Sequence, residues 1–178
     1  MLIFDTINYN KNMAAVTLGG TPVNTSGELP QVGSKAPGFT LTANDLSSVS
    51  LNDYQGSRLI LNVFPSVDTG TCAQSIRQFN KEASALNNTK VLCISKDLPF
   101  AQARFCGAEG IENVVTLSDY KDGSFGKSYG LDFVDGAFDT LLSRCIVVVN
   151  EQGDVIHTEQ VSEIADEPNY KAALDALS

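Results

Sequence analysis

The central part of the chain alternates short apolar runs with segments whose apolar residues recur at helical spacing. Ile76, Phe79 and Leu86, for example, fall on one face of a helix that follows an apolar run. Pro99 and Gly107 stand at the two boundaries of the next helical segment, where these residue types are common. The predicted strands cover residues 59–64, 91–95 and 113–117, and the predicted helices cover 70–86, 99–106 and 124–129.

Turn residues separate the remaining elements. Gly19 and Gly20 stand between residues 15–18 and Val23, which predicts an N-terminal β-hairpin. Residues 47–51 alternate weakly and indicate a short strand. Near the C-terminus, residues 150–153 form a hairpin-type turn between two apolar strands, and a segment in helical register follows. These last elements cover residues 145–149, 155–161 and 168–177.

This order of elements predicts an α/β fold. Strands that alternate with helices and end in a hairpin and a closing helix suit a mixed central sheet flanked by helices on both faces, with the N-terminal β-hairpin as an extension. The length of 178 residues suits one domain, which we expect over residues 14–178. Residues 1–13 have neither a basic start nor an apolar block, so they predict a flexible extension rather than a secretory signal.

Composition excludes several classes of function. The net charge of −9 argues against nucleic acid or an anionic membrane as a partner. No apolar run reaches the ~18–20 residues of a membrane span. A single histidine and four cysteines without a C-x-x-C pair give metal binding little support, and no phosphate-binding glycine motif is present. With few cysteines and no signal, we expect a cytoplasmic protein, where an oxidising cysteine pair is more often catalytic than structural.

Cys72 lies where a predicted strand passes into a predicted helix. With Thr69 as the N-cap, Cys72 falls in the first helical turn. Unpaired backbone N–H groups and the positive end of the helix dipole surround a side chain there and favour a reactive thiolate. These local features alone leave two interpretations about equally supported, a reactive cysteine and a buried small hydrophobe.

Two stretches of the sequence carry a family resemblance. Residues 65–72 read Pro-Ser-Val-Asp-Thr-Gly-Thr-Cys and match the pattern Pro-x-x-x-Thr-x-x-Cys, and residues 97–110 read DLPFAQARFCGAEG. Together they resemble the bacterial thiol peroxidases, a subfamily of the peroxiredoxins, and the resemblance runs from about Val16 to the C-terminus.

The resemblance implies a thioredoxin-like fold and the reduction of hydrogen peroxide and alkyl hydroperoxides without a cofactor or metal. It makes Cys72 the peroxidatic thiolate and Cys106 the resolving thiol, and it places Thr69, Arg144 and Pro65 around Cys72. It further implies an intramolecular disulfide, reduction by thioredoxin and a homodimer. In such a sheet the strand after Arg144 runs antiparallel to strand 59–64, which brings Arg144 to the Cys72 loop.

The sequence also supports other interpretations of individual residues and one rival function. Cys93 and Cys145 lie in apolar strands and are expected to be buried small hydrophobes. Arg77 and Arg104 are weaker candidates for the site, and Arg77, five residues after Cys72, is expected to brace the loop or a neighbouring segment. The rival function is a non-enzymatic thioredoxin-like redox sensor or disulfide relay, which would consume peroxide only stoichiometrically. Thiols near the ends of two helices seldom lie within disulfide distance, so we expect the first turn after Thr69 to unwind during turnover.

Overall fold

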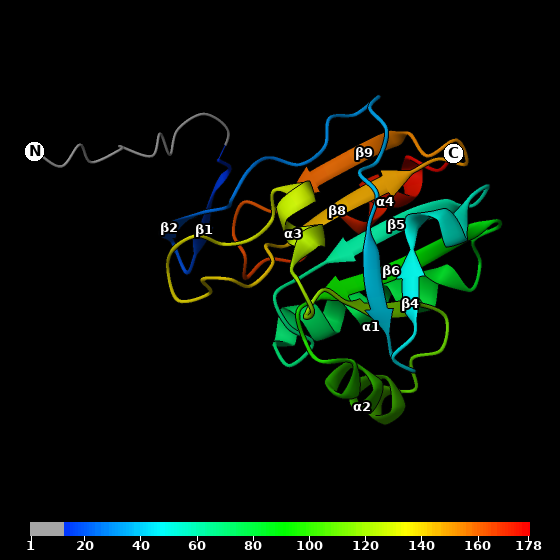
Figure 1. Cartoon of the computed structure of the whole chain (residues 1–178), viewed down its shortest axis with the longest axis horizontal. Coiled ribbons are helices and arrows are strands. Elements are labelled where there is room, and N and C mark those ends of the chain that lie inside the picture. The colour runs from blue at the N-terminus through cyan, green and yellow to red at the C-terminus, as the bar shows by residue number, and fades with distance from the viewer. Residues whose placement is uncertain (1–12) are drawn as a thin grey trace, which may run out of the picture.

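The computed structural model describes residues 13–178, so the predicted N-terminal extension lies outside the described residues except for Met13. A mixed seven-stranded sheet forms the centre, and a separate two-stranded hairpin stands at one side of it (Figure 1). The strands are β1 (Ala15–Leu18), β2 (Thr21–Asn24), β3 (Thr40–Ala43), β4 (Ser48–Ser50), β5 (Arg58–Val63), β6 (Thr89–Ser95), β7 (Val115–Ser118), β8 (Cys145–Val149) and β9 (Val155–Gln160). The helices are α1 (Gly70–Ala83), α2 (Pro99–Glu109), α3 (Ser124–Tyr129) and α4 (Tyr170–Asp175), and a short 3₁₀ turn covers Leu51–Tyr54.

The sheet has the strand order β4-β3-β7-β6-β5-β8-β9. Strands β5, β6 and β7 are parallel, whereas β8 runs antiparallel to β5 and β9 antiparallel to β8. Val63 at the end of β5 pairs with Cys145 at the start of β8. The expected antiparallel pairing is therefore confirmed, and it brings Arg144 beside the loop that leaves β5.

Apolar side chains cover both faces of this sheet. On one face, Ile76 and Phe79 of α1, Phe105 of α2 and Ala173 of α4 pack in a single cluster with inward residues of the strands. On the other face, Phe125 and Tyr129 of α3 pack against a second cluster, and Figure 1 shows α3 lying over the sheet. Successive strand residues alternate between the two clusters, as the pleat requires. The predicted α/β fold with a flanked mixed sheet is confirmed.

The boundaries of three predicted helices are wrong. α1 ends at Ala83 rather than at residue 86, because the chain tightens there into a turn in which the backbone N–H of Leu86 donates to the carbonyl oxygen of Ala83 at 3.2 Å. α2 continues past Gly107 to Glu109 and ends at Gly110, whose left-handed backbone (φ 64°) caps the helix. Cys106 therefore lies inside α2 rather than at its end, because the local glycine signal for a helix end fits both positions. The closing helix is shorter than predicted, since Asn169 caps it by accepting a hydrogen bond from the backbone N–H of Ala172.

Two carboxylates attach the N-terminal hairpin to the body, Asp135 at Asn24 of β2 and Glu163 at the other end of the hairpin. Glu163 accepts hydrogen bonds from the hydroxyl of Thr17 and from the backbone N–H groups of Gly19 and Gly20. Ile164 joins a small apolar cluster with Val16 of β1. The loop after β9 therefore holds the hairpin in place. Among residues 13–178, the helices are too short or too polar to cross a bilayer.

Candidate active site

The loop between β5 and α1 places Cys72 in the first turn of a helix. Pro65 is buried in this loop, Thr69 occupies the N-cap with extended backbone angles, and α1 begins at Gly70. The Cys72 side chain is fully buried, at 0% exposure. The predicted position of the cysteine at a helix N-terminus is thus what the structure shows, and the sulfur is shielded from bulk water.

The hydroxyl of Thr69 is directed to the sulfur rather than to the helix backbone. Thr69 Oγ1 lies 2.6 Å from Cys72 Sγ and 3.2 Å from the carbonyl oxygen of Ser66, and its proton can serve either acceptor. No side-chain cap hydrogen bond to α1 is formed. Thr69 occupies the N-cap position as expected, but the expectation that its side chain also caps the helix is wrong, because Oγ1 is turned toward Cys72 Sγ and the Ser66 carbonyl oxygen and accepts no hydrogen bond from the first turn of α1.

Arg144 brings a buried positive charge to the same sulfur. Its side chain is 2% exposed. Nη2 donates to Cys72 Sγ at 3.3 Å, across a separation of 72 residues in sequence, and Nε donates to the carbonyl oxygen of Ile164 at 2.9 Å. Within residues 13–178, Nη1 is buried and has no hydrogen-bond partner. A guanidinium at this distance stabilises a thiolate relative to a thiol.

Cys106 has a different set of contacts. Its half-buried sulfur lies 3.8 Å from Thr116 Oγ1 on β7, and burial raises the pKa of its thiol. It packs at the edge of the apolar cluster that contains Cys72. All four cysteines are free. Cys106 is therefore a protonated thiol at rest and shares neither Thr69 nor Arg144 with Cys72.

Two exposed ion pairs link the segments that carry the two cysteines. Arg77 of α1 contacts Glu109 of α2 at 2.8 Å, and Arg104 of α2 contacts Asp68 of the loop at 3.0 Å. Both pairs line a hollow of about 310 Å³ between α1 and α2. Arg77 thus braces a neighbouring segment, in agreement with the interpretation from the sequence, and Arg104, for which the sequence predicted no bracing role, does the same.

Residues 31–174 match the family model described as Redoxin. The thiol peroxidase of Mycobacterium tuberculosis is 56% identical over 165 residues, which is 93% of this chain and 99% of that protein. The chain belongs to the thiol peroxidases of the redoxin family.

Solved structures agree with this assignment. A peroxiredoxin-like protein from Aquifex aeolicus has a TM-score of 0.86 at 31% identity, with 94% of this chain and 98% of that chain covered. The thiol peroxidase from Chromobacterium violaceum has a TM-score of 0.85 at 21% identity, with 92% and 94% covered, and supports the fold. The chain is accordingly a thiol-dependent peroxidase.

The other two cysteines of this thiol peroxidase are buried among apolar side chains. Burial raises the pKa of the Cys93 thiol to about 12, and it also raises the pKa of Cys145. Cys93 Sγ has a polar neighbour at 3.6 Å, the amide nitrogen of Asn62. Both thiols are protonated at neutral pH, which agrees with their interpretation as packing residues.

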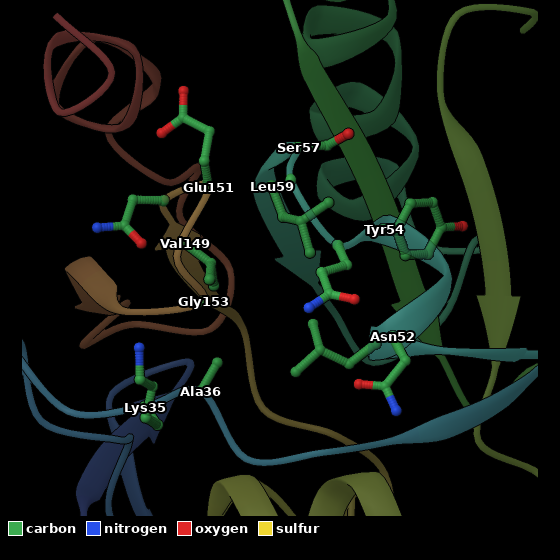
Figure 2. A pocket seen from close by; sticks show the side chains of 13 residues that line it. Lys35, Ala36, Asn52, Tyr54, Ser57, Leu59, Val149, Glu151 and Gly153 are labelled. Atoms are coloured by element: carbon green, nitrogen blue, oxygen red, sulfur yellow. The ribbon is translucent and has the colours of Figure 1, made fainter.

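A second hollow lies at the opposite end of the sheet from Cys72. It has a volume of about 170 Å³ and opens between the start of β5 and the end of β8, with Lys35, Tyr54 and Glu151 among its walls (Figure 2). None of the residues described as lining it is a cysteine. Lys35 is held by Asp154 at 2.6 Å. This hollow lacks the thiol that the family chemistry needs.

Sequence reasoning missed three groups that hold the surroundings of Cys72. The carbonyl oxygen of Ile164 accepts from Arg144, and the carbonyl oxygen of Ala165 accepts from Thr71 Oγ1 at 2.9 Å. Asp97 accepts hydrogen bonds from the loop before Cys72. Backbone carbonyls leave no signal in a sequence. An acidic residue between an apolar strand and Pro99 is a weak signal, because such residues are common in loops.

Proposed function

We propose that Cys72 is the peroxidatic cysteine of this thiol peroxidase and that Cys106 resolves the oxidised form. The Cys72 thiolate attacks one oxygen of a hydroperoxide, the O–O bond breaks, and the second oxygen leaves as an alcohol or as water after protonation. Cys72 then carries a sulfenic acid. The Cys106 thiol displaces its hydroxyl as water and forms a disulfide, and an external dithiol returns both thiols.

The observation that carries the peroxide step is the convergence of Thr69 and Arg144 on one buried sulfur. Their donors lie 2.6 Å and 3.3 Å from Cys72 Sγ. The nitrogen Nη1 of Arg144, with its two N–H bonds, is buried and unpartnered within the described residues, which is costly unless an acceptor binds there. A peroxide oxygen is such an acceptor. The same guanidinium would stabilise the negative charge that grows on the leaving oxygen.

Pro65 has a supporting role in this proposal. It is buried and has no N–H group, so it can close one side of the site without adding a donor that competes for the sulfur. Its fixed φ also limits the conformations of the loop that leads to Thr69.

The resolving step requires a change of structure in this proposal. Cys72 Sγ is held by Thr69 and Arg144, whereas Cys106 Sγ faces Thr116 within an intact α2. Both helices must yield locally before a disulfide can form. The two exposed ion pairs between α1 and α2 are individually weak, so they permit such a change.

The remaining features of the proposal follow from the family and from composition. Hydrogen peroxide and alkyl hydroperoxides are the substrates, thioredoxin is the reductant, and no metal or organic cofactor takes part, because two thiols and an external dithiol supply both electrons. Residues 14–178 act as one domain, and the active form is a cytoplasmic homodimer. The net charge of −9 supports the absence of nucleic acid and membrane partners.

The test is peroxide-dependent turnover with thioredoxin, thioredoxin reductase and NADPH. We expect many turnovers for the wild type and none for Cys72→Ser, because a serine hydroxyl is a far weaker nucleophile at neutral pH. Cys93→Ser is the matched control, since it removes a buried thiol that contacts neither Thr69 nor Arg144. Turnover that survives in Cys72→Ser would contradict the assignment, and a single stoichiometric oxidation of the wild type would favour a sensor or relay.

A further inference from the structure

Asp97 joins the loop before Cys72 to the end of β6. Its Oδ1 accepts a hydrogen bond from the Ser66 hydroxyl at 2.7 Å, and its Oδ2 accepts from the backbone N–H of Val67 at 2.8 Å. The hydroxyl of Ser95, the last residue of β6, also donates to Oδ2 at 2.6 Å. One carboxylate thus receives both a side-chain donor and a main-chain donor from the peroxidatic loop.

The hydrogen bonds continue from this loop to the sulfur. The carbonyl oxygen of Ser66 accepts from the backbone N–H of Thr69 at 3.2 Å and lies 3.2 Å from Thr69 Oγ1. Thr69 Oγ1 in turn lies 2.6 Å from Cys72 Sγ. The position of Ser66 therefore determines where the Thr69 hydroxyl stands relative to the sulfur, and Asp97 holds Ser66.

Asp97 is itself fixed by three elements. The hydroxyl of Ser118, at the end of β7, donates to the carbonyl oxygen of Asp97 at 2.5 Å. The buried amide of Gln102, on α2, donates to Ser95 Oγ at 3.1 Å and to the carbonyl oxygen of Leu117 at 3.0 Å. Asp97 is therefore held directly by β6 and β7, and α2, the helix that carries Cys106, reaches the carboxylate through Ser95, so Asp97 can transmit their position to the loop.

We infer that Asp97 is a positioning residue for the peroxide step, acting through Ser66 and Thr69 on Cys72. It touches neither the sulfur nor, in the proposed function on which this inference rests, the peroxide. A carboxylate suits the role because it accepts all three hydrogen bonds and offers no competing donor. Displacing a reacting group by about 1 Å can cost about a hundredfold in rate.

The experiment compares Asp97→Ala and Asp97→Asn with the wild type. Pre-reduced enzyme is mixed with one equivalent of hydrogen peroxide, and the second-order rate constant is expressed per Cys72 that iodoacetamide can titrate. We expect Asp97→Ala to lose at least about tenfold in this rate constant, because the loop loses both of its anchors. Asp97→Asn should recover most of the loss, since its amide oxygen can still accept from Val67 and its nitrogen can donate to Ser66.

A purely structural role predicts a different result. It would lower the melting temperature of Asp97→Ala and leave the rate constant per titrated Cys72 unchanged, which would overturn the inference. Asp45→Ala is the matched control, because Asp45 accepts from the backbone and the hydroxyl of Ser47 in the same way but lies away from the site. We expect this control to keep the wild-type rate constant.

Ser66→Ala keeps the inference testable if Asp97→Ala does not fold. It removes the Oδ1 contact and the hydrogen bond that Ser66 Oγ accepts from the backbone N–H of Asp68 at 3.2 Å, and it leaves the bond from Val67 to Oδ2 in place. It should lower the rate constant by at least about threefold, a fraction of the loss that displacement of the whole loop would cause. An unchanged rate constant in Ser66→Ala would overturn the inference. If the wild type does not consume peroxide at Cys72, the proposed function fails. If it does and the Asp97 variants react at the wild-type rate, only the positioning role fails.

Discussion

At the scale of single residues, the site depends on two side chains that approach one sulfur from different parts of the chain. Thr69 belongs to the same turn as Cys72, whereas Arg144 comes from the start of β8. The Thr69 hydroxyl lies near Cys72 because both residues belong to the same short motif, residues 65–72. The guanidinium is present only because β8 pairs with β5.

Replacing Arg144 tests this convergence. Arg144→Ala should lower the rate constant for hydrogen peroxide by about a hundredfold, because a hydrogen-bond donor and a positive charge at the sulfur are lost together. The pH–rate profile of a single turnover should move to higher pH, since the thiolate loses its counter-charge. Arg144→Lys should recover only part of the rate, because an ammonium lacks the planar fork that reaches both Ile164 and Cys72.

Lys90→Ala is the control for Arg144. It removes an exposed cation at the start of β6, far from the end of β5 where Cys72 lies. The control should keep both the rate constant and the pH profile of the wild type. A wild-type pH profile in Arg144→Ala would place this arginine outside the reacting site.

At the scale of elements, the proposed function requires the first turn of α1 to be both ordered and able to unwind. Its order holds Cys72 under Thr69 and Arg144, and its unwinding would free the sulfur for Cys106. Gly70 is the first residue of α1, and a Cβ at this position would have no atom within 4 Å. An alanine therefore fits the folded form and stiffens it.

Gly70→Ala should slow disulfide formation more than the reaction with peroxide. The substitution favours the helical turn by up to about 1 kcal/mol, and this preference opposes unwinding. A longer-lived sulfenic acid meets a second peroxide more often, so sulfinic acid should accumulate at Cys72. After graded doses of peroxide, mass spectrometry measures the ratio of sulfinic acid at Cys72 to the Cys72–Cys106 disulfide.

Hydrogen exchange on the reduced and oxidised forms checks the same step without a substitution. Amide protection should fall on oxidation in residues 69–76 and 100–107 and stay high in β5, whose backbone bonds are buried in the sheet. Equal protection of these segments in both forms would mean that disulfide formation needs no unwinding.

At the scale of the whole molecule, the N-terminal hairpin and the active site share one loop. Glu163 holds the hairpin, the carbonyl oxygen of Ile164 holds Arg144, and the carbonyl oxygen of Ala165 accepts from Thr71. These three consecutive residues tie a hairpin at the start of the chain to a guanidinium at the sulfur. A displacement of the hairpin can therefore move Arg144 and Thr71 relative to Cys72.

The attachment of the hairpin should depend on pH. Hydrogen bonds from Thr17, Gly20, Ala165 and Gly19 lower the pKa of Glu163 from 4.5 to about 2. The folded form thus binds fewer protons than the unfolded form between these values, so the contribution of Glu163 to stability is present above pH 4.5 and is lost as the pH falls toward 2.

Glu163→Gln should remove this part of the acid dependence. The melting temperature of the wild type should fall more steeply than that of the variant between pH 4.5 and 2, because only the wild type takes up the proton. The two curves should run in parallel above this range, and thermal scans at a series of pH values measure both. Parallel curves across the whole range would show that Glu163 does not control the acid stability of the fold.

The sequence by itself determined the alternation of strands and helices, the strand-to-helix junction at Cys72 and the motif that identifies the family. These features are readable because each depends on residues close together in the chain: apolar periodicity, glycine and proline at turns, and a cysteine three residues after an N-cap threonine. Burial of Cys93 and Cys145 also follows from their apolar neighbours.

Only the tertiary structure decided the partners of the sulfur and of its loop. The Thr69 hydroxyl points to Cys72 instead of capping α1, because the fold brings Cys72 Sγ and the Ser66 carbonyl within its reach. α2 passes Gly107 because Gly110 can adopt the left-handed cap. The roles of Asp97 and of the Ile164 carbonyl depend on contacts across 20 to 31 residues of sequence. A hydrogen bond between distant segments exists only once strand pairing has set their distance, and no local pattern records it.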